Sequence, residues 1–255
     1  MIGTKEREET RQRIAESCKR LILSQKMVEL CETEATPKQE EFLSYVLEQE
    51  LLRREQNQRT RQLNRACFPV LKSIENYEYG SIRFPPALTK EEMLSCSFVG
   101  EKKNLILYGP VGIGKTHLAI ALGVKACGMG MNVRFYTVTE LVLKLGEAHR
   151  SGTLERLVRD LQRLDLLILD EWGYVPVDKE GSQLLFRIVA DSYESKSLIL
   201  TTNLEFSKWG GIFTDEQMAA AMIDRLVHHG HLLLFEGQSY RMTHALMRRT
   251  VKSSA

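Results

Sequence analysis

The chain has 255 residues, of which 43% are hydrophobic and 27% charged, and its formal net charge at pH 7 is +2. This composition is typical of a globular protein and excludes a disordered chain, and a net charge this small does not by itself indicate nucleic-acid binding. The length accommodates one large domain, or a core domain with a small appendage.

Cysteine usage and hydropathy bear on the compartment. The five cysteines are odd in number and scattered, with no CxxC pair, which is typical of reduced thiols rather than of a zinc site or a disulfide framework. The first residues, MIGTKEREETRQR, contain no apolar signal region, and no stretch approaches the about 20 apolar residues that span a bilayer. We therefore expect a cytoplasmic protein without a membrane segment.

Residues 1–66 are predicted to form a small all-helical domain. Residues 5–66 contain no glycine and one proline, and they are rich in Glu, Arg, Gln and Leu, which favour helices. Because Pro37 suits a first helical position, the pause at Thr36-Pro37 predicts two or more helices. The helical faces are predicted to carry Ile14, Cys18, Leu21 and Ile22 in the first part, and Phe42, Val46 and Leu47 in the second.

Strands and helices are predicted to alternate in residues 102–247, after a connector of residues 67–101 that contains three prolines. Thr137 and Glu140 have the spacing of a capping box at the start of one helix. The regular alternation predicts a mainly parallel sheet sandwiched by helices, and residues 248–255 are predicted to be a disordered tail. The predicted strands are 104–108, 132–136, 166–169, 197–201 and 231–235, and further predicted helices are 115–127, 154–164, 180–192 and one that ends near 227.

A phosphate-binding loop is predicted between the first strand of this region and its first helix. The segment GPVGIGKT fits the pattern G-x-x-x-x-G-K-[ST] in full, and its strand and helix flanks disfavour a chance match by a glycine-rich turn. Lys115 is predicted to neutralise β- and γ-phosphate charge, and the Thr116 hydroxyl to bind Mg²⁺. The predicted ATP-binding residues are Gly109, Pro110, Val111, Gly112, Ile113, Gly114, Lys115 and Thr116, followed by His117.

Two acidic residues follow four consecutive aliphatic residues, 166–169, which predict a central buried strand. Asp170 is placed to bind Mg²⁺ and Glu171 to act as the general base, whereas two acids at a strand end are in isolation only a solvated terminus. Residues 170–173 also match the D-x-x-G of GTPases, but the chain contains no N-K-x-D segment, which favours ATP. Asn203, after the next strand, is predicted to contact the γ-phosphate or the attacking water.

These motifs together resemble those of AAA+ ATPases. The stretch MIDRLVHHGHLLLFEGQSYR, residues 222–241, is similar more narrowly to IstB-like ATP-binding proteins, which assist insertion-sequence transposases, and to their relatives, the DnaC helicase loaders. The resemblance implies an α/β P-loop AAA+ domain that follows the helical domain in the sequence. It also implies that Arg225 is an arginine finger for a neighbouring subunit, and that Arg241 is a second sensor of the nucleotide in its own subunit.

The same resemblance implies partners. We expect an ATP- and Mg²⁺-dependent ATPase that assembles as a ring or spiral on duplex DNA and recruits a transposase, with a DnaC-type helicase loader as the alternative. In similar proteins the connector packs around the adenine, so candidates for this role are Tyr77, Tyr79 and Phe84, for each of which packing in the core is the alternative.

Basic residues gather in two places that are candidates for DNA contact. The first is the end of the helical domain, where Arg54, Arg61 and Arg65 share a helical face. The second includes Lys144 and Arg150, near a predicted turn at 146–152. The alternative for both is a solvated basic face. Since no helix-turn-helix or zinc pattern occurs, we expect contacts to the DNA backbone with little sequence preference.

Overall fold

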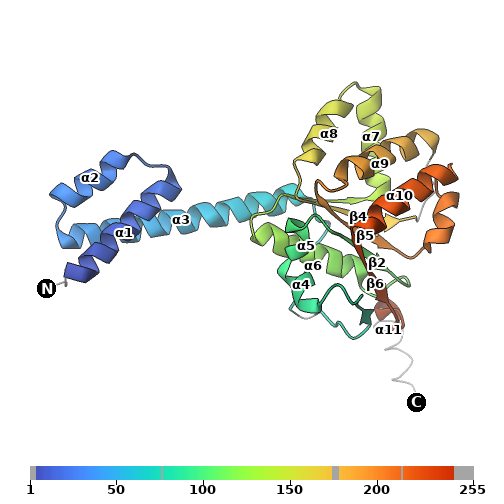
Figure 1. The fold of residues 1–255 in the computed structure, drawn as a ribbon, viewed down its shortest axis with the longest axis horizontal. Helices are drawn as coiled ribbons and strands as arrows, with labels where there is room; N and C mark the ends of the chain where they lie inside the picture. Colours follow the sequence, from blue (N-terminus) through green and yellow to red (C-terminus); the bar gives the residue numbers. More distant parts are fainter. Residues whose placement is uncertain (1–3, 76, 174–177, 214, 244–255) are drawn as a thin grey trace, which may run out of the picture. The chain divides into compact units, whose positions relative to one another are not determined.

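The computed structural model describes residues 4–75, 77–173, 178–213 and 215–243. The chain divides into two compact units, Met1–Arg61 and Gln62–Ala255 (Figure 1). The predicted tail, 248–255, lies outside the described residues. Among the described residues, no helix combines the length and the apolar character that a membrane crossing requires.

The smaller unit is helical, as predicted, and its helices are α1 (Thr4–Leu21), α2 (Gln25–Glu34) and α3 (Pro37–Ala66), the last of which continues into the larger unit. A break that the sequence did not reveal follows Leu21, where Ile22 adopts a left-handed φ of 59° and is 90% exposed instead of buried. Ser24 then caps α2 by accepting a hydrogen bond from the Lys26 N–H. The buried residues of this unit's apolar core are Ile14, Cys18, Leu21, Cys31 and Leu47.

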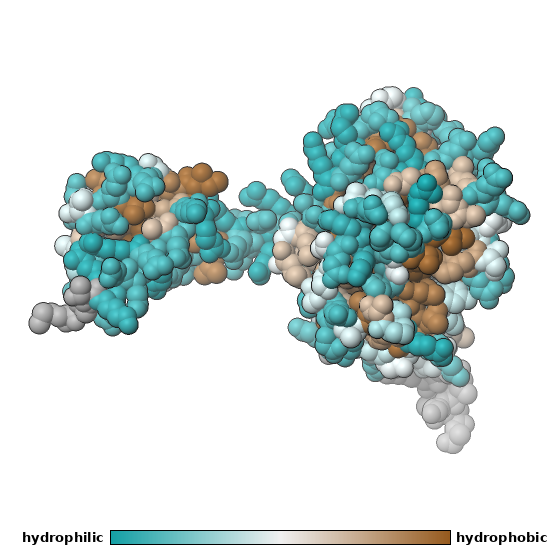
Figure 2. Space-filling model, viewed as in Figure 1, coloured by the Kyte–Doolittle hydropathy of each residue, from teal (hydrophilic) through white to brown (hydrophobic). Residues whose placement is uncertain are grey.

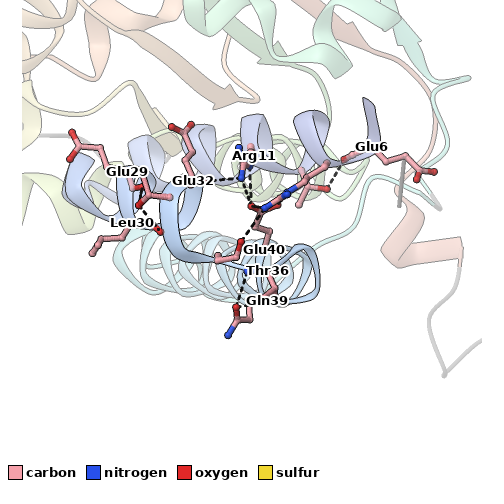
Figure 3. A network of polar contacts seen from close by, with 12 residues as sticks. Glu6, Arg11, Glu29, Leu30, Glu32, Thr36, Gln39 and Glu40 are labelled. Atoms are coloured by element: carbon pink, nitrogen blue, oxygen red, sulfur yellow. Dashed lines mark hydrogen bonds and ion pairs between the residues drawn. The ribbon is translucent and has the colours of Figure 1, made fainter. Parts of the chain in front are cut away.

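A buried carboxylate fixes α1 and the α2–α3 turn against the start of α3 (Figure 3). The side chain of Glu40 is fully buried and accepts hydrogen bonds of 2.8–2.9 Å from the guanidinium groups of Arg7 and Arg11. Arg7 also donates to the Ala35 carbonyl, and Arg11 to the Glu32 carbonyl. The hydrogen bonds from Arg7, and then those from Arg11, hold the pKa of Glu40 below its usual value, so the carboxylate stays charged.

The outward face of α3 is partly apolar, which corrects the predicted helical face. Phe42 is 69% exposed and Val46 is also exposed, whereas Leu47 is buried beside the partly buried Leu43 and Leu51. The face that packs on the other helices is therefore displaced from the predicted one, because α1 and the Glu40 contacts set the rotation of α3. Apolar surface on this unit is visible in Figure 2.

The larger unit is built on a six-stranded sheet of order β1-β6-β2-β5-β4-β3. All neighbouring strands are parallel except β1 (Ile82–Arg83), which is antiparallel to β6. The predicted parallel sheet is thus confirmed, and β1 was not predicted because two residues carry no strand pattern. The five parallel strands are β2 (Asn104–Tyr108), β3 (Val133–Thr137), β4 (Leu166–Trp172), β5 (Ser197–Thr202) and β6 (Gly230–Phe235).

Helices cover both faces of this sheet, because its central strands are apolar on both sides. Leu105 and Leu107 of β2 belong to one apolar core, and Ile106 between them belongs to the other. The first core is covered by α4 (Lys90–Ser95), α5 (Ser97–Gly100) and α6 (Lys115–Gly128). The second is covered by α7 (Val138–Arg150), α8 (Leu154–Gln162), α9 (Lys179–Ser192), α10 (Glu216–His228) and the 3₁₀ helix η1 (Phe206–Gly211).

The segment 67–101, predicted to be a connector, instead packs into the larger unit. It forms β1, α4 and α5, and Leu88, Met93 and Phe98 are buried in the first core. A capping box of Thr89 and Glu92 starts α4. Burial of these apolar side chains explains why the boundary between the compact units falls after residue 61 and not on either side of the proline-bearing segment.

Candidate functional site

Two positions in the loop that follows β2 require glycine. Gly112 has a φ of +81°, and a Cβ atom there would lie 2.2 Å from the Ser239 hydroxyl oxygen. Gly114, which precedes α6, has a φ of +108°, and its Cβ would lie 2.9 Å from the Tyr77 hydroxyl. The glycines therefore let two distant segments, around Tyr77 and Ser239, close directly onto the loop.

Lys115, the first residue of α6, is buried within this loop. Its Nζ donates hydrogen bonds of 2.7 Å to the carbonyls of Gly109 and Pro110. Burial lowers the pKa of Lys115 to about 8, an effect that Asp170 opposes and the nearby charge of Arg241 reinforces. A bound polyphosphate would stabilise the charged form of such a lysine, because its negative charge offsets the cost of burying the ammonium.

Asp170 lies at the carboxyl end of β4 and is 4% exposed. Its Oδ1 accepts a hydrogen bond of 2.8 Å from the Thr116 hydroxyl and another from the Thr201 hydroxyl of β5. A hydroxyl and a carboxylate side by side are oxygen donors of the kind that Mg²⁺ takes from P-loop proteins, with the remaining positions left to phosphate and water. Thr116 and Asp170 therefore fit a magnesium ion.

Glu171 is presented to solvent by an irregular backbone. The β4–β5 register shifts between Leu169 and Trp172, and Glu171 in this bulge has a φ of +62°, which is uncommon for a residue other than glycine. Its N–H donates to the Thr201 hydroxyl at 3.1 Å, while the fully buried Trp172 anchors the next position. Strain of this kind clusters at functional sites, and here it places an exposed carboxylate beside a buried one.

Thr201 was missed by sequence reasoning. Its hydroxyl both accepts from the Glu171 N–H and donates to Asp170, so it joins the two acidic residues. The only signal in the sequence is a hydroxyl residue at the end of the strand that neighbours the acidic pair. Asn203 follows this strand and is exposed, at the same edge of the sheet as Asp170.

A cavity of about 830 Å³ opens beside the loop. Its lining includes Gly112, Ile113, Gly114, Lys115, Thr116 and His117 of the predicted loop, together with Tyr77 and Arg241. The Tyr77 hydroxyl donates to the Gly114 carbonyl, and its ring lies edge-on to His117. Tyr79 and Phe84 pack against the first apolar core and are absent from the lining residues that the structure describes.

The two predicted arginines are in different surroundings. Arg241 is exposed in the short helix α11 (Tyr240–Thr243), which is held on the loop by the hydrogen bond from the Tyr240 N–H to the Gly112 carbonyl. Arg225 lies on α10 and does not line this cavity. Its Nη1 donates to the Ala221 carbonyl, and its guanidinium carbon lies 5.3 Å from the centre of the Phe186 ring.

The candidate DNA contacts differ in availability. Arg54 is paired with Glu50 at 2.9 Å, whereas Arg61 and Arg65 are exposed. Lys144 and Arg150 are exposed on α7; the helix runs through Arg150, so the turn starts only at residue 151, later than predicted. Lys144 contacts the Tyr136 hydroxyl and lines a second cavity, of about 390 Å³, together with Arg134 and Arg156.

Comparison with known proteins places this geometry in a family context. A family model described as IstB-like ATP binding protein matches residues 21–247. An ATP-binding protein of insertion sequence IS21 from Pseudomonas aeruginosa is 40% identical, over 79% of this chain and 76% of its own length. An ATP-binding protein of insertion sequence IS5376 from Geobacillus stearothermophilus is 34% identical, over 91% of this chain and 94% of its own length. Among solved structures, that of the DnaC helicase loader aligns with a TM-score of 0.47 at 22% identity, over 69% of this chain and 99% of that one.

Proton uptake on ATP binding is the expected consequence of the lowered Lys115 pKa of about 8. Bound phosphate raises this pKa, so the complex holds more protons than the free protein above pH 8, and affinity should fall by up to about tenfold per pH unit there. Calorimetry at pH 8.5 in buffers of different ionisation enthalpy measures the uptake directly. Lys125→Arg, on the exposed side of the same helix, should leave it unchanged; ATP binding without proton uptake by the wild type contradicts the assignment.

Proposed function

This chain belongs to the IstB-like ATP-binding protein family, and we propose that it is a cytoplasmic ATPase that assembles on duplex DNA in the ATP-bound state and recruits a partner transposase. The observation that carries the ATPase proposal is the Thr201 hydroxyl, which joins the buried Asp170 to the strained, exposed Glu171. A protein that binds ATP without hydrolysing it requires the Asp170 carboxylate for Mg²⁺ but does not require a general base such as Glu171.

ATP would occupy the cavity beside the loop. The backbone N–H groups of residues 111–116 and the dipole of α6 would bind the phosphates, with Lys115 supplying positive charge. Tyr77 and His117 would flank the adenine, and Arg241 would contact the nucleotide from α11. Thr116 and Asp170 would hold Mg²⁺, which neutralises charge on the phosphates when it is bound.

Hydrolysis follows from the exposed carboxylate. Glu171 would accept a proton from a water molecule whose oxygen attacks the γ-phosphorus, as the bond to the β–γ bridging oxygen breaks and ADP takes the electron pair. Asn203, at the same edge of the sheet, would orient this water. Arg225 lies outside the cavity of its own subunit, which supports a role at the γ-phosphate of a neighbour. Assembly into a ring or spiral would then complete each site.

The DNA and transposase roles rest on the family. The two similar ATP-binding proteins from Pseudomonas aeruginosa and Geobacillus stearothermophilus come from insertion sequences, which favours a transposition helper over a helicase loader. Lys144 and Arg150 are exposed on α7. Lys144 lines the second cavity with two further cations, Arg134 and Arg156, and with the acidic Glu147 and Asp160. The basic side chains would contact DNA phosphates, and they offer charge without an arrangement for reading bases.

Glu171→Gln should lower ATP turnover by about 10²–10⁴-fold while ATP binding persists, because the amide cannot accept the proton. Turnover is measured with and without duplex DNA, which should stimulate the wild type. Glu194→Gln is a matched control, since Glu194 is also exposed and also has a positive φ, of 53°. If the wild type and Glu171→Gln are equally inactive under both conditions, the protein is not an ATPase.

Replacing Lys144 and Arg150 by Gln should weaken DNA binding and reduce its salt dependence by about 0.9 in log–log slope for each lost phosphate contact. Fluorescence anisotropy of labelled duplex DNA at increasing KCl concentration gives this slope. The matched comparison is Arg61→Gln with Arg65→Gln, which removes two charges from α3 that are also exposed. A slope that changes only in the α3 variant would place the DNA contacts there instead.

A further inference from the structure

The side chain of Arg225 is held by contacts that leave its charge unpaired. Its Nη1 donates a hydrogen bond to the Ala221 carbonyl, and its guanidinium lies over the Phe186 ring. Within the described residues, no carboxylate forms an ion pair with it. Arg187, which follows Phe186, is by contrast paired with Glu155 at 2.8 Å. The positive charge of Arg225 is thus ordered but not neutralised.

Phe186 is suited to orient this guanidinium. It lies on α9, which is packed beside α10 (Figure 1), and its ring is partly buried against the second apolar core, which fixes the direction of its face. The distance of 5.3 Å from guanidinium carbon to ring centre lies within the range in which the negative face of an aromatic ring attracts a cation. The ring offers no hydrogen-bond acceptor that competes with phosphate for the five N–H donors of arginine.

We propose that Phe186 is a positioning residue, which holds Arg225 in the direction needed to reach the γ-phosphate bound by a neighbouring subunit. The proposal rests on the proposed function of Arg225 in a neighbour's site. A free arginine side chain loses much rotamer freedom on binding, and a residue that orders it beforehand reduces this loss. Phe186 therefore acts on hydrolysis only through Arg225, and on the site of the next subunit rather than its own.

The first test is substitution of the ring. Phe186→Leu keeps an apolar side chain and removes the aromatic face, and it should lower assembly-dependent ATP turnover by about tenfold, as misplacement of a catalytic group does. ATP affinity should not change. Phe186→Tyr restores a ring and should return turnover to within about twofold of the wild type, since both rings attract cations. Phe186→Leu turnover at half the wild-type value or more would overturn the proposal.

Mixing of variants separates positioning from general damage. Phe186→Leu subunits retain an intact site, and Glu171→Gln subunits retain Arg225, so an equimolar mixture should regain up to about one quarter of wild-type turnover in a randomly mixed head-to-tail assembly. A mixture of Phe186→Leu with Arg225→Ala should show no gain, because neither supplies a positioned arginine.

The mixture of Arg225→Ala with Glu171→Gln is the reference. If this reference gains turnover and the mixture of Phe186→Leu with Glu171→Gln does not, Phe186 supports its own subunit's site and the positioning role is wrong. If the reference shows no gain either, Arg225 does not act on a neighbour's site, and the positioning role is overturned together with that part of the proposed function.

Discussion

The buried carboxylate of Asp170 is the constraint on which the site depends. A carboxylate that is 4% exposed needs hydrogen-bond donors, and it receives them from Thr116 at the start of α6 and from Thr201 in β5. These two contacts tie the phosphate-binding loop to the central strands. Because Thr201 also accepts from the Glu171 N–H, the same group fixes the bulge that turns Glu171 outward. Magnesium binding and water activation would therefore share one framework.

Two segments far apart in the sequence close on this framework. Tyr77 reaches the Gly114 carbonyl from the segment before the sheet, and the N–H of Tyr240 reaches the Gly112 carbonyl from the segment after it. Both approaches depend on glycine, which lacks the Cβ that would collide with the Tyr77 and Ser239 hydroxyls. The position of the loop is therefore tied directly to both segments.

Much of the fold can be predicted from sequence because local residue patterns specify its strands and helices. The aliphatic run 166–169 predicts a buried strand, the loop motif predicts its own strand and helix flanks, and the capping box of Thr137 and Glu140 is present as predicted. The positions of Lys115, Thr116 and Asp170 around one another follow from parallel strands that end at one edge.

Other features could not be predicted, because long-range packing decides them. Nothing local marks the two-residue strand β1, and the capping-box spacing of Thr89 and Glu92 marks only the start of α4. The helices of the supposed connector form by burying Met93 and Phe98 in a core supplied mainly by later residues. Thr201 and Phe186 are ordinary residues in their own segments. Thr201 becomes distinctive only beside Asp170, and Phe186 only beside Arg225.

If each site needs Arg225 from a neighbouring subunit, ATP binding and assembly on DNA would be one event. Sedimentation velocity of the full chain with duplex DNA tests this directly, with a non-hydrolysable ATP analogue, with ADP, or without nucleotide. The wild type should form large complexes only with the ATP analogue, and Lys115→Ala, which removes the buried charge at the loop, should form none. Equally large complexes without nucleotide, or full assembly by Lys115→Ala, would contradict this prediction.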